Sequence, residues 1–401
     1  MKLKEYRLGD LIEVTRGASL AGDYYASEGK YKRITLGNFN YKEGGFKDDT
    51  QKEDIYYTGK VDDRFILRKG DILTPLTEQA LGLLGSTIRI PEDDKYIQSQ
   101  DVALITCKEG KIDPDFCYYL ISSAQVRNQL SAAAQQTKIR HTSPDKIKAC
   151  KVFIPDLAEQ KKIGQLLRLI EEKISLNKQI NQNLEALAKQ LYDYWFVQFD
   201  FPDENGKPYK SSGGAMVYNE KLKRDIPKGW EVKHLRDFST ICRGSIITEA
   251  QTNKGNIKVV AAAVTFSYLH DKANRKANVI TISSSGANAG YMNFWREPIF
   301  ASDCITIQCD SDIDTILIFH QLELYRDAIM QKSHGSAQPH VYPTDIDCLN
   351  FVCIPNYLKN KISTLFITWN KHIANNVIET EKLIKQRDEL LPLLMNGQVT
   401  L

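Results

Sequence analysis

Apolar residues recur along two long stretches of the chain in alternating steps of four and three, the spacing of a helix that packs along a partner helix. The first stretch begins at Ile163 and the second at Ile362, and they repeat each other position for position. The first seam consists of Ile163, Leu167, Ile170, Ile174, Asn177, Asn181, Leu184, Ala188, Leu191 and Trp195, and the second of Ile362, Phe366, Trp369, Ile373, Asn376, Thr380, Leu383, Arg387, Leu390 and Leu394.

The two helices are predicted to pack on each other, because a lone amphipathic helix of this length exposes too much apolar surface. If they run antiparallel about their midpoints, Asn177 faces Thr380 and Asn376 faces Asn181. Polar seam residues of this kind fix the register at some cost in stability. The stripe is widened by apolar residues beside the seam, which indicates a further partner: Leu166, Ile180 and Leu187.

Each helical stretch follows a segment of short runs typical of β-strands, with one shorter helix. In the first half, the predicted strands are Lys32–Leu36, Asp71–Thr74, Thr87–Ile90 and Val102–Cys107, and the helix is Asp115–Ser131. In the second half, the strands are Ile257–Ala261, Val279–Ser283 and Cys304–Cys309, and the helix is Asp314–Lys332.

The two halves also share sequence motifs in the same order. Leu8-x-Asp10-Leu11-x-x-Val14-x-Arg16-Gly17 returns as Leu235-x-Asp237-Phe238-x-x-Ile241-x-Arg243-Gly244. Later echoes pair Asp101-Val102-x-x-Ile105-x-Cys107 with Asp303-Cys304-x-x-Ile307-x-Cys309, Gln136-x-x-Ile139 with Gln338-x-x-Val341, and Val152-Phe153-Ile154-Pro155 with Val352-Cys353-Ile354-Pro355. The chain is therefore a tandem duplication.

The predicted fold class is α+β: two similar mixed α/β domains separated by a pair of long antiparallel coiled-coil helices, with a pseudo-two-fold internal repeat. The predicted boundaries are 1–155 for the first domain, 156–200 for the first helix, 201–228 for a turn-rich connector, 229–355 for the second domain and 356–397 for the second helix. The connector is long enough to let the chain return and begin the second domain at the far end of the first helix.

Composition narrows the class of protein. The 401 residues suit two or three domains, and 42% hydrophobic with 26% charged residues is typical of a soluble globular chain. The net charge of +3 means that any nucleic-acid binding depends on local patches. A polar N-terminus and the lack of a long apolar run favour a cytoplasmic location.

The eight cysteines contain no C-x-x-C pair. Cys304 and Cys309, like Cys348 and Cys353, lie five apart in β-rich sequence, where an odd separation directs two side chains to opposite faces of a strand. We therefore expect reduced, buried thiols and no metal site.

Catalytic motifs give no support for an enzyme. The nucleotide-binding, zinc-protease and hydrolase signatures are missing from the sequence, as is the Asn-Pro-Pro-aromatic motif of adenine methyltransferases. Two acids and a lysine, Asp156, Glu159 and Lys161, have a spacing seen in nucleases, but the two acids fit a helix capping box better than a nuclease site. His334 and His340 lack a nucleophile or acid at a suitable spacing, so no catalytic residue is predicted.

Basic and amide residues interleaved with aromatics give the more useful signal, because arginine and lysine bind phosphates and guanine edges while asparagine and glutamine bind adenine. A small-residue run around Ser285 and Asn288 is expected to form a tight loop near DNA. The predicted DNA-binding residues are Lys30, Lys32, Arg33, Asn38, Asn40, Lys42, Gln136, Lys138 and Arg140 in the first half, and Lys272, Asn274, Arg275, Lys276, Ser285, Asn288, Gln338 and His340 in the second.

Four blocks of sequence resemble the specificity subunit of type I restriction-modification systems. They are Ile154-Pro155-Asp156-Leu157-Ala158-Glu159-Gln160-Lys161-Lys162-Ile163, Leu184-Glu185-Ala186-Leu187-Ala188, Trp195-Phe196-Val197-Gln198-Phe199-Asp200 and Ile226-Pro227-Lys228-Gly229-Trp230. The resemblance spans nearly the whole chain. It departs at the start of the second helix, where Asn356 to Lys361 lacks the Leu-x-Glu-Gln pattern, which puts the capping there in doubt.

The resemblance implies a non-catalytic subunit in which each domain reads one half of a bipartite, asymmetric double-stranded DNA target. The helices would set the gap between the halves and bind two methyltransferase subunits, and nuclease-translocase subunits would join the complex. S-adenosylmethionine, ATP and Mg²⁺ would be used by those partners, with no cofactor in this chain. A predicted helix of roughly 50 Å, at about 1.5 Å per residue, suits domains on successive DNA turns of about 34 Å.

Two alternatives stay open at this point. A self-contained nuclease or methyltransferase would lose activity on substitution of Glu159 or His334. A coiled-coil adaptor for proteins alone would show no sequence-selective DNA binding, even within a complex.

Overall fold

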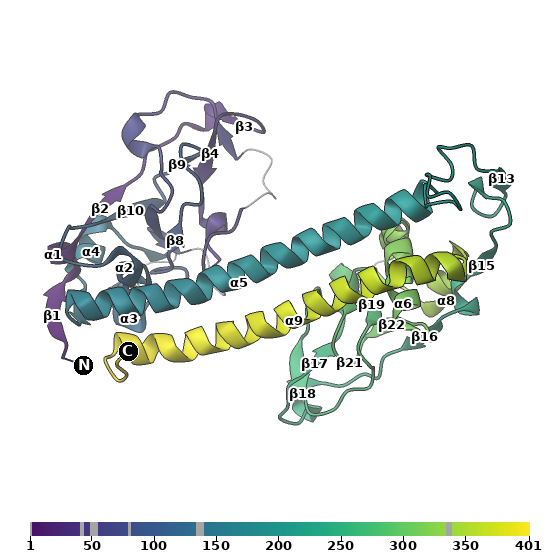
Figure 1. Cartoon of the computed structure of the whole chain (residues 1–401). Coiled ribbons are helices and arrows are strands. Elements are labelled where there is room, and N and C mark those ends of the chain that lie inside the picture. Colours follow the sequence, from purple (N-terminus) through teal and green to yellow (C-terminus); the bar gives the residue numbers. More distant parts are fainter. Residues whose placement is uncertain (1, 41–43, 49–54, 79–81, 134–139, 334–338) are drawn as a thin grey trace. The chain divides into compact units, whose positions relative to one another are not determined.

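The computed structural model describes residues 2–40, 44–48, 55–78, 82–133, 140–333 and 339–401. The chain forms two compact units (Figure 1). The first unit contains Met1–Leu176 and Thr380–Leu401, and the second contains Asn177–Glu379. Each unit therefore combines one mixed domain with a part of both long helices.

The first unit contains a four-stranded sheet in the order β2-β10-β6-β8 and a smaller sheet in the order β3-β5-β4-β9. The first sheet comprises β2 (Ile12–Arg16), β10 (Val102–Cys107), β6 (Ile72–Pro75) and β8 (Ile88–Arg89), and the second comprises β3 (Tyr25–Ala26), β5 (Tyr56–Tyr57), β4 (Tyr31–Ile34) and β9 (Tyr96–Gln98). Two further pairs join β1 (Lys4–Arg7) to β12 (Lys151–Ile154) and β7 (Thr77–Glu78) to β11 (Arg140–His141). The helices are α1 (Leu8–Leu11), α2 (Pro114–Ile121), α3 (Ala124–Ala133) and α4 (Pro144–Ala149).

The second unit repeats this topology. Its four-stranded sheet has the order β16-β22-β19-β20, and a three-stranded sheet has the order β18-β17-β21. The strands are β15 (Val232–His234), β16 (Thr240–Arg243), β17 (Ile257–Val260), β18 (Tyr268–His270), β19 (Val279–Ser283), β20 (Met292–Trp295), β21 (Ile299–Ala301), β22 (Cys304–Gln308) and β23 (Asn350–Val352), with a hairpin of β13 (Met216–Asn219) and β14 (Arg224–Pro227) ahead of them. The helices are α6 (Asp312–Glu323), α7 (Arg326–Ser333) and α8 (Pro343–Asp347). The duplication predicted from sequence is thus a duplication of fold.

The predicted strands are confirmed, but both predicted domain helices are broken. Asp115–Ser131 is divided into α2 and α3 at Ser122 and Ser123, whose hydroxyls donate to backbone carbonyls of the preceding turn. Such local bonds compete with the helix ladder. Asp314–Lys332 is divided into α6 and α7 at Leu324, which caps α6.

The two long helices are α5 (Leu157–Tyr192), which ends in a π-helical turn over Asp193–Val197, and α9 (Asn356–Met395). The carboxylate of Asp156 accepts from the backbone N–H of Glu159 at 3.0 Å, which confirms the predicted cap. In a full capping box the Glu159 carboxylate would also accept from the backbone N–H of Asp156. Here it accepts from Lys162 Nζ at 2.7 Å. The second helix begins at Asn356 although its first turn lacks the Leu-x-Glu-Gln pattern.

The predicted seam is confirmed, since all of its positions on both helices are buried or half-buried. In the second unit, Asn376 Nδ2 donates to Asn181 Oδ1 at 2.8 Å, as the antiparallel register requires. Asn177 Nδ2 donates to Glu379 Oε2 at 2.8 Å. The pairing of Asn177 with Thr380 stays a prediction. Of the flanking residues, Leu166 packs on the core of the first unit, whereas Ile180 and Leu187 are exposed.

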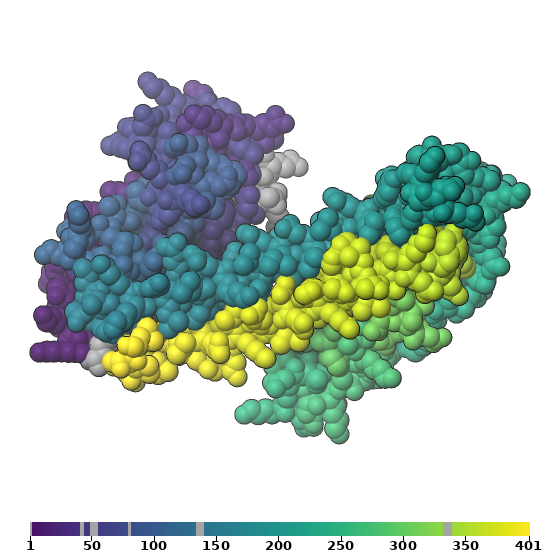
Figure 2. All heavy atoms as spheres, in the orientation of Figure 1, coloured from purple at the N-terminus to yellow at the C-terminus, as the bar shows by residue number. Residues whose placement is uncertain are grey.

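Each domain core is completed by both helices. In the first unit, Ile163 and Leu167 of α5 and Leu394 and Met395 of α9 belong to the buried cluster of the mixed domain. Figure 2 shows the end of α9, in yellow, against the start of α5. In the second unit, the buried cluster includes Tyr192 of α5 and the α9 residues Leu358, Ile362 and Phe366.

The cysteine prediction is partly wrong. Cys304 is buried and Cys309 half-buried, but Cys348 is exposed at the end of α8 and Cys353 lies after β23. That second pair therefore does not share a strand. Within the described part of the chain, no helix combines the length and apolar character needed to cross a membrane.

The repeated Arg-Gly of the opening motifs has a steric cause. A Cβ atom at Gly17 would lie 2.2 Å from the Ser99 carbonyl oxygen, and one at Gly244 would lie 2.0 Å from that of Ser302. Both glycines follow the first strand of their sheet and donate to the strand beside it, Gly17 to Val102 and Gly244 to Cys304. A side chain at either position would push two backbone segments apart.

We therefore expect Gly244→Ala to lower the free energy of unfolding by about 1–3 kcal/mol, as overpacking does in other interiors. Gly22→Ala is the matched control, because a Cβ there meets no atom within 4 Å. Urea unfolding followed by circular dichroism measures both. Equal losses for the two variants would contradict the steric explanation.

The seam asparagines give a second test. Asn376→Leu removes the amide that donates to the side-chain oxygen of Asn181. We expect it to lower the free energy of unfolding by about 1–3 kcal/mol. The double replacement Asn181→Leu with Asn376→Leu is expected to recover most of that loss, because apolar seam residues stabilise helix pairs. Exposed Asn375→Leu serves as the control. Strictly additive losses in a double-mutant cycle would refute the pairing.

Candidate nucleic-acid interface

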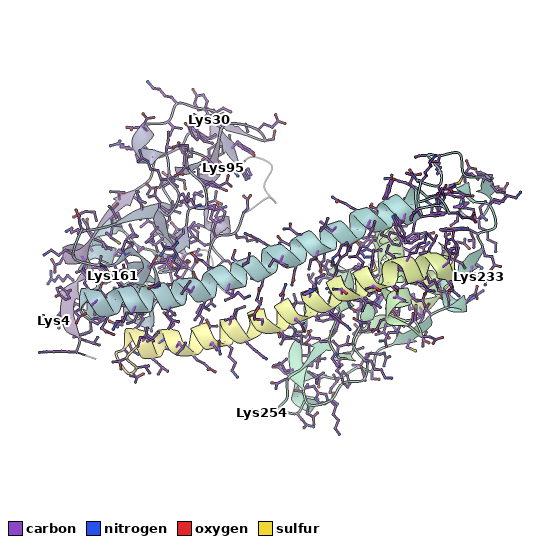
Figure 3. All side chains as sticks on the ribbon, in the orientation of Figure 1. Lys4, Lys30, Lys95, Lys161, Lys233 and Lys254 are labelled. Atoms are coloured by element: carbon purple, nitrogen blue, oxygen red, sulfur yellow. The ribbon has the colours of Figure 1, made fainter. Side chains whose placement is uncertain are left out.

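The small sheet of the first unit carries cations placed against tyrosine rings. Lys30 Nζ lies 4.7 Å from the ring centroid of Tyr31, and the guanidinium carbon of Arg33 lies 3.5 Å from that of Tyr25. The hydrogen bond with Tyr31 raises the pKa of Lys30. Figure 3 shows Lys30 and Lys95 in this same outer part of the first domain. Such a surface suits nucleic acid, which offers phosphates to cations and base faces to rings.

Not all predicted residues of this region are available for DNA. Lys32 pairs with Asp48 at 3.3 Å, so its charge is partly neutralised. Asn38 is buried, its oxygen accepts from Thr35 N at 2.8 Å and its amide donates to the Lys47 carbonyl at 3.0 Å. Asn38 is therefore a structural residue and is withdrawn as a base contact. Asn40 is half-buried beside it.

The second-half cluster is corrected in the same way. Asn274 exchanges two hydrogen bonds with the backbone of Ala301, at 2.9 and 2.7 Å. Arg275 donates to Thr306 Oγ1 at 2.9 Å and to the Arg243 carbonyl at 3.1 Å. Both residues therefore brace the sheet, and their role in DNA binding stays a prediction. Lys272 and Lys276 remain exposed.

A second polar site lies where β7 pairs with β11. Residue Arg140 lies opposite Glu78, and His141 lies opposite Thr77. Thr77 Oγ1 and His141 Nδ1 are 3.3 Å apart, and Arg140 Nη1 donates to Glu78 Oε2 at 3.3 Å. The predicted residue Arg140 thus lies in an ion pair with a buried carboxylate.

The equivalent site of the second unit brings Ser285 opposite His340. The hydroxyls of Ser284 and Ser285 both donate to the carboxylate of Asp303. The guanidinium of Arg243 lies 5.8 Å from the Tyr342 ring, which stacks on His340. Burial acts to raise the pKa of Asp303, but these hydroxyls and the charges of Arg243 and His340 outweigh it, so the pKa lies below its ordinary value.

The structure revises one sequence echo. Thr142 N donates to the Leu76 carbonyl at 2.8 Å, and Val341 N donates to the Ser284 carbonyl at 3.0 Å. Each residue also stands just before the cap of a helix that begins with proline. Val341 therefore corresponds to Thr142 and not to Ile139, and His340 corresponds to His141.

Several predictions lie outside the described residues: Lys42, Gln136, Lys138 and Gln338. Asn288 is half-buried in a short 3-10 turn after Ser285. Sequence reasoning missed Arg16 and Arg243, the exposed arginines at the ends of β2 and β16. The signal was present, because both belong to the repeated Arg-Gly motif.

A network of polar contacts attaches the second domain to its helices. Arg296 donates to Asn370 Oδ1 of α9 at 2.8 Å and pairs with Glu185 of α5 at 3.1 Å. Beside it, a cavity of about 510 Å³ is lined by helix and domain residues, including His320. Burial lowers the pKa of His320 to about 4. This imidazole is therefore neutral at pH 7. The contacts of Arg296 with Asn370 and Glu185 hold the second domain on its helices.

The outer face of α5 carries a second apolar row. We call it the outer stripe: Leu169, Leu176, Ile180 and Leu187 of α5 and Tyr194 of the π-helical turn that follows, which are 38–55% exposed. Steps of seven and four place these residues on one side of a helix. The equivalent positions of α9 are Thr368, Asn375, Glu379, Gln386 and Leu393. Four of these five positions of α9 are therefore polar, so the outer stripe is not repeated on α9.

Comparisons with known proteins agree with this architecture. Residues 2–186 and 227–378 match the family described as Type I restriction modification DNA specificity domain. The chain is similar to the HindI specificity subunit of Haemophilus influenzae, with 22% identity over 99% of both chains. It is also similar to the MjaIX specificity subunit of Methanocaldococcus jannaschii, with 23% identity over 73% of this chain and 70% of that relative.

One solved structure shows the same fold. It is the S subunit of a type I restriction-modification system from M. genitalium, with a TM-score of 0.66, 15% identity and coverage of 98% of this chain and 96% of that one. The family match covers both copies of the duplicated domain and most of the helices. The chain therefore belongs to the type I restriction modification DNA specificity domain family.

Proposed function

We propose that this chain is the DNA-target recognition subunit of a type I restriction-modification complex. The observation that carries the proposal is the duplicated domain, whose framing strands agree while its exposed polar residues differ. Two domains with the same strands but different exposed polar residues suit a DNA target whose two halves differ in sequence. Family membership and full-length similarity to specificity subunits support the same conclusion.

The first domain would read one half-site and the second domain the other. Arg140 and His141 in the first domain, and Arg243, Ser285 and His340 in the second, present donors and acceptors that can reach base edges or phosphates. Lys30, Lys272 and Lys276 would bind the DNA backbone, which sets position without reading sequence. At a net charge of +3, binding would depend on such local cations.

The helices would bind methyltransferase subunits, and nuclease-translocase subunits would complete the complex. The outer stripe supports this part of the proposal, because an exposed apolar row on one helix suits an amphipathic helix of a partner. The chain itself would be non-catalytic. S-adenosylmethionine, ATP and Mg²⁺ would then belong to the partner subunits.

The runner-up is a coiled-coil adaptor that binds proteins alone. It would use the same helices, but it gives no reason for two domains that keep one frame and vary their polar residues. Sequence-selective modification of DNA separates the two functions.

Coexpression with type I methyltransferase subunits, followed by mapping of methylated adenines in host DNA, tests the proposal. We expect a bipartite motif that depends on this chain. Replacing residues 1–155 with another specificity domain should change one half of the motif and leave the other. Methylation that is absent, or that ignores the replacement, would favour the adaptor.

The outer stripe predicts a partner-specific loss. Leu187→Glu places a charge in an apolar interface and is expected to weaken assembly at least tenfold, because an unpaired buried charge costs more than about 1.4 kcal/mol. Gln386→Glu, at the equivalent position of α9, is the matched control. Analytical ultracentrifugation of chain and methyltransferase subunits measures assembly. Equal effects of the two variants would refute a role specific to α5.

A further inference from the structure

The Glu78 carboxylate connects two segments of the first domain that are distant in sequence. Its side chain is only 3% exposed. Oε1 accepts from the backbone N–H of Gly82 at 2.7 Å, and Oε2 accepts from Arg140 at 3.3 Å. One buried acid therefore holds both the turn after β7 and the strand β11.

A buried carboxylate is costly unless it is paired and hydrogen-bonded. Glu78 meets that requirement only while Gly82 and Arg140 keep their places. Loss of the charge would release the Arg140 guanidinium, and β11 is a strand of only two residues, Arg140–His141. The geometry of Arg140 and His141 therefore depends on this acid.

The equivalent site of the second domain also contains a carboxylate, but it comes from a different position in the chain and has different partners. Ser284 and Ser285 correspond to Leu76 and Thr77, so the position of Glu78 is taken by Gly286, which has no side chain. The carboxylate comes instead from Asp303, which precedes β22 and accepts from both serine hydroxyls. Ser285 in turn lies opposite His340.

The exchange is complementary. Asp101, the counterpart of Asp303, is exposed. Leu76 has no hydroxyl, and the Thr77 hydroxyl lies 3.3 Å from His141 Nδ1. Each domain thus has one hydrogen-bonded carboxylate at this site. In the first domain it comes from β7 and accepts from Gly82 and Arg140, and in the second it precedes β22 and accepts from Ser284 and Ser285. A carboxylate is thus present at this site in both domains although it comes from two different places in the chain, which indicates a function beyond filling the core.

We propose that Glu78 and Asp303 are positioning residues for DNA recognition, each for the half-site read by its own domain. Glu78 would act through Arg140 and His141, and Asp303 through Ser285 and His340. This inference rests on the proposed function. It makes the acids determinants of specificity, although neither need touch the DNA.

The test uses the complete complex of this chain with methyltransferase subunits, and duplexes that carry the mapped motif or a single-base change in either half. Glu78→Gln is expected to reduce discrimination against changes in one half-site by about tenfold, within the range that a single mismatch contributes. Asp303→Asn is expected to do the same for the other half-site only. Ser284→Ala removes one of the two hydroxyls that donate to Asp303 and leaves Ser285 unchanged, and it should lower the same discrimination.

Matched controls are Glu92→Gln in the first domain and Glu231→Gln in the second, which remove exposed ion pairs with Lys95 and Lys233. A merely structural role would lower binding to all duplexes alike, with a reduced melting temperature and unchanged discrimination. That result, or loss of discrimination in both halves at once, would overturn the inference. If the wild-type complex shows no motif, the proposed function itself fails, which is a distinguishable outcome.

Discussion

The structure depends on one constraint, namely that two long amphipathic helices must cover each other's apolar seam. That seam does not stand apart from the domains. Leu394 and Met395, close to the C-terminus, are buried in the same cluster as Leu8 and Leu11 near the N-terminus. The core of the first domain is therefore closed by residues that lie far apart in the sequence, and non-local closure of this kind is slow to form.

This constraint explains which parts of the duplication agree. Strand pairs such as Val14 with Ile105 and Ile241 with Ile307 occupy equivalent registers, because both sheets must present the same face to a helix. Gly17 and Gly244 agree because two backbone segments nearly touch there. Residues outside these contacts are free of that demand, and there the copies differ.

The sequence predicted the parts that periodicity and repetition encode. The helical seams, several strands within each half and the family followed from spacing and shared motifs. The side-chain roles did not follow, because a polar residue in a loop looks the same whether it faces DNA or the backbone. Asn274 and Arg275 illustrate this, since tertiary hydrogen bonds to Ala301 and Thr306 use their polar atoms. The breaks at Ser122 and Leu324 were not predicted for another reason: local capping outweighed a continuous apolar pattern.

Repetition of the fold does not make the two halves equivalent as surfaces. The seam is duplicated because α5 and α9 bury their apolar residues against each other. A row of residues that faces a partner protein does not have to match a row on the other helix. The outer stripe is accordingly present on α5 and largely polar on α9, where Glu379 and Gln386 replace Ile180 and Leu187. The two acids follow the same logic, since Glu78 of β7 and Asp303 before β22 lie at equivalent sites but bind different partners. Internal packing therefore enforces the symmetry of this chain, and the surfaces that packing leaves free are where an asymmetric target and unequal partner contacts can be accommodated.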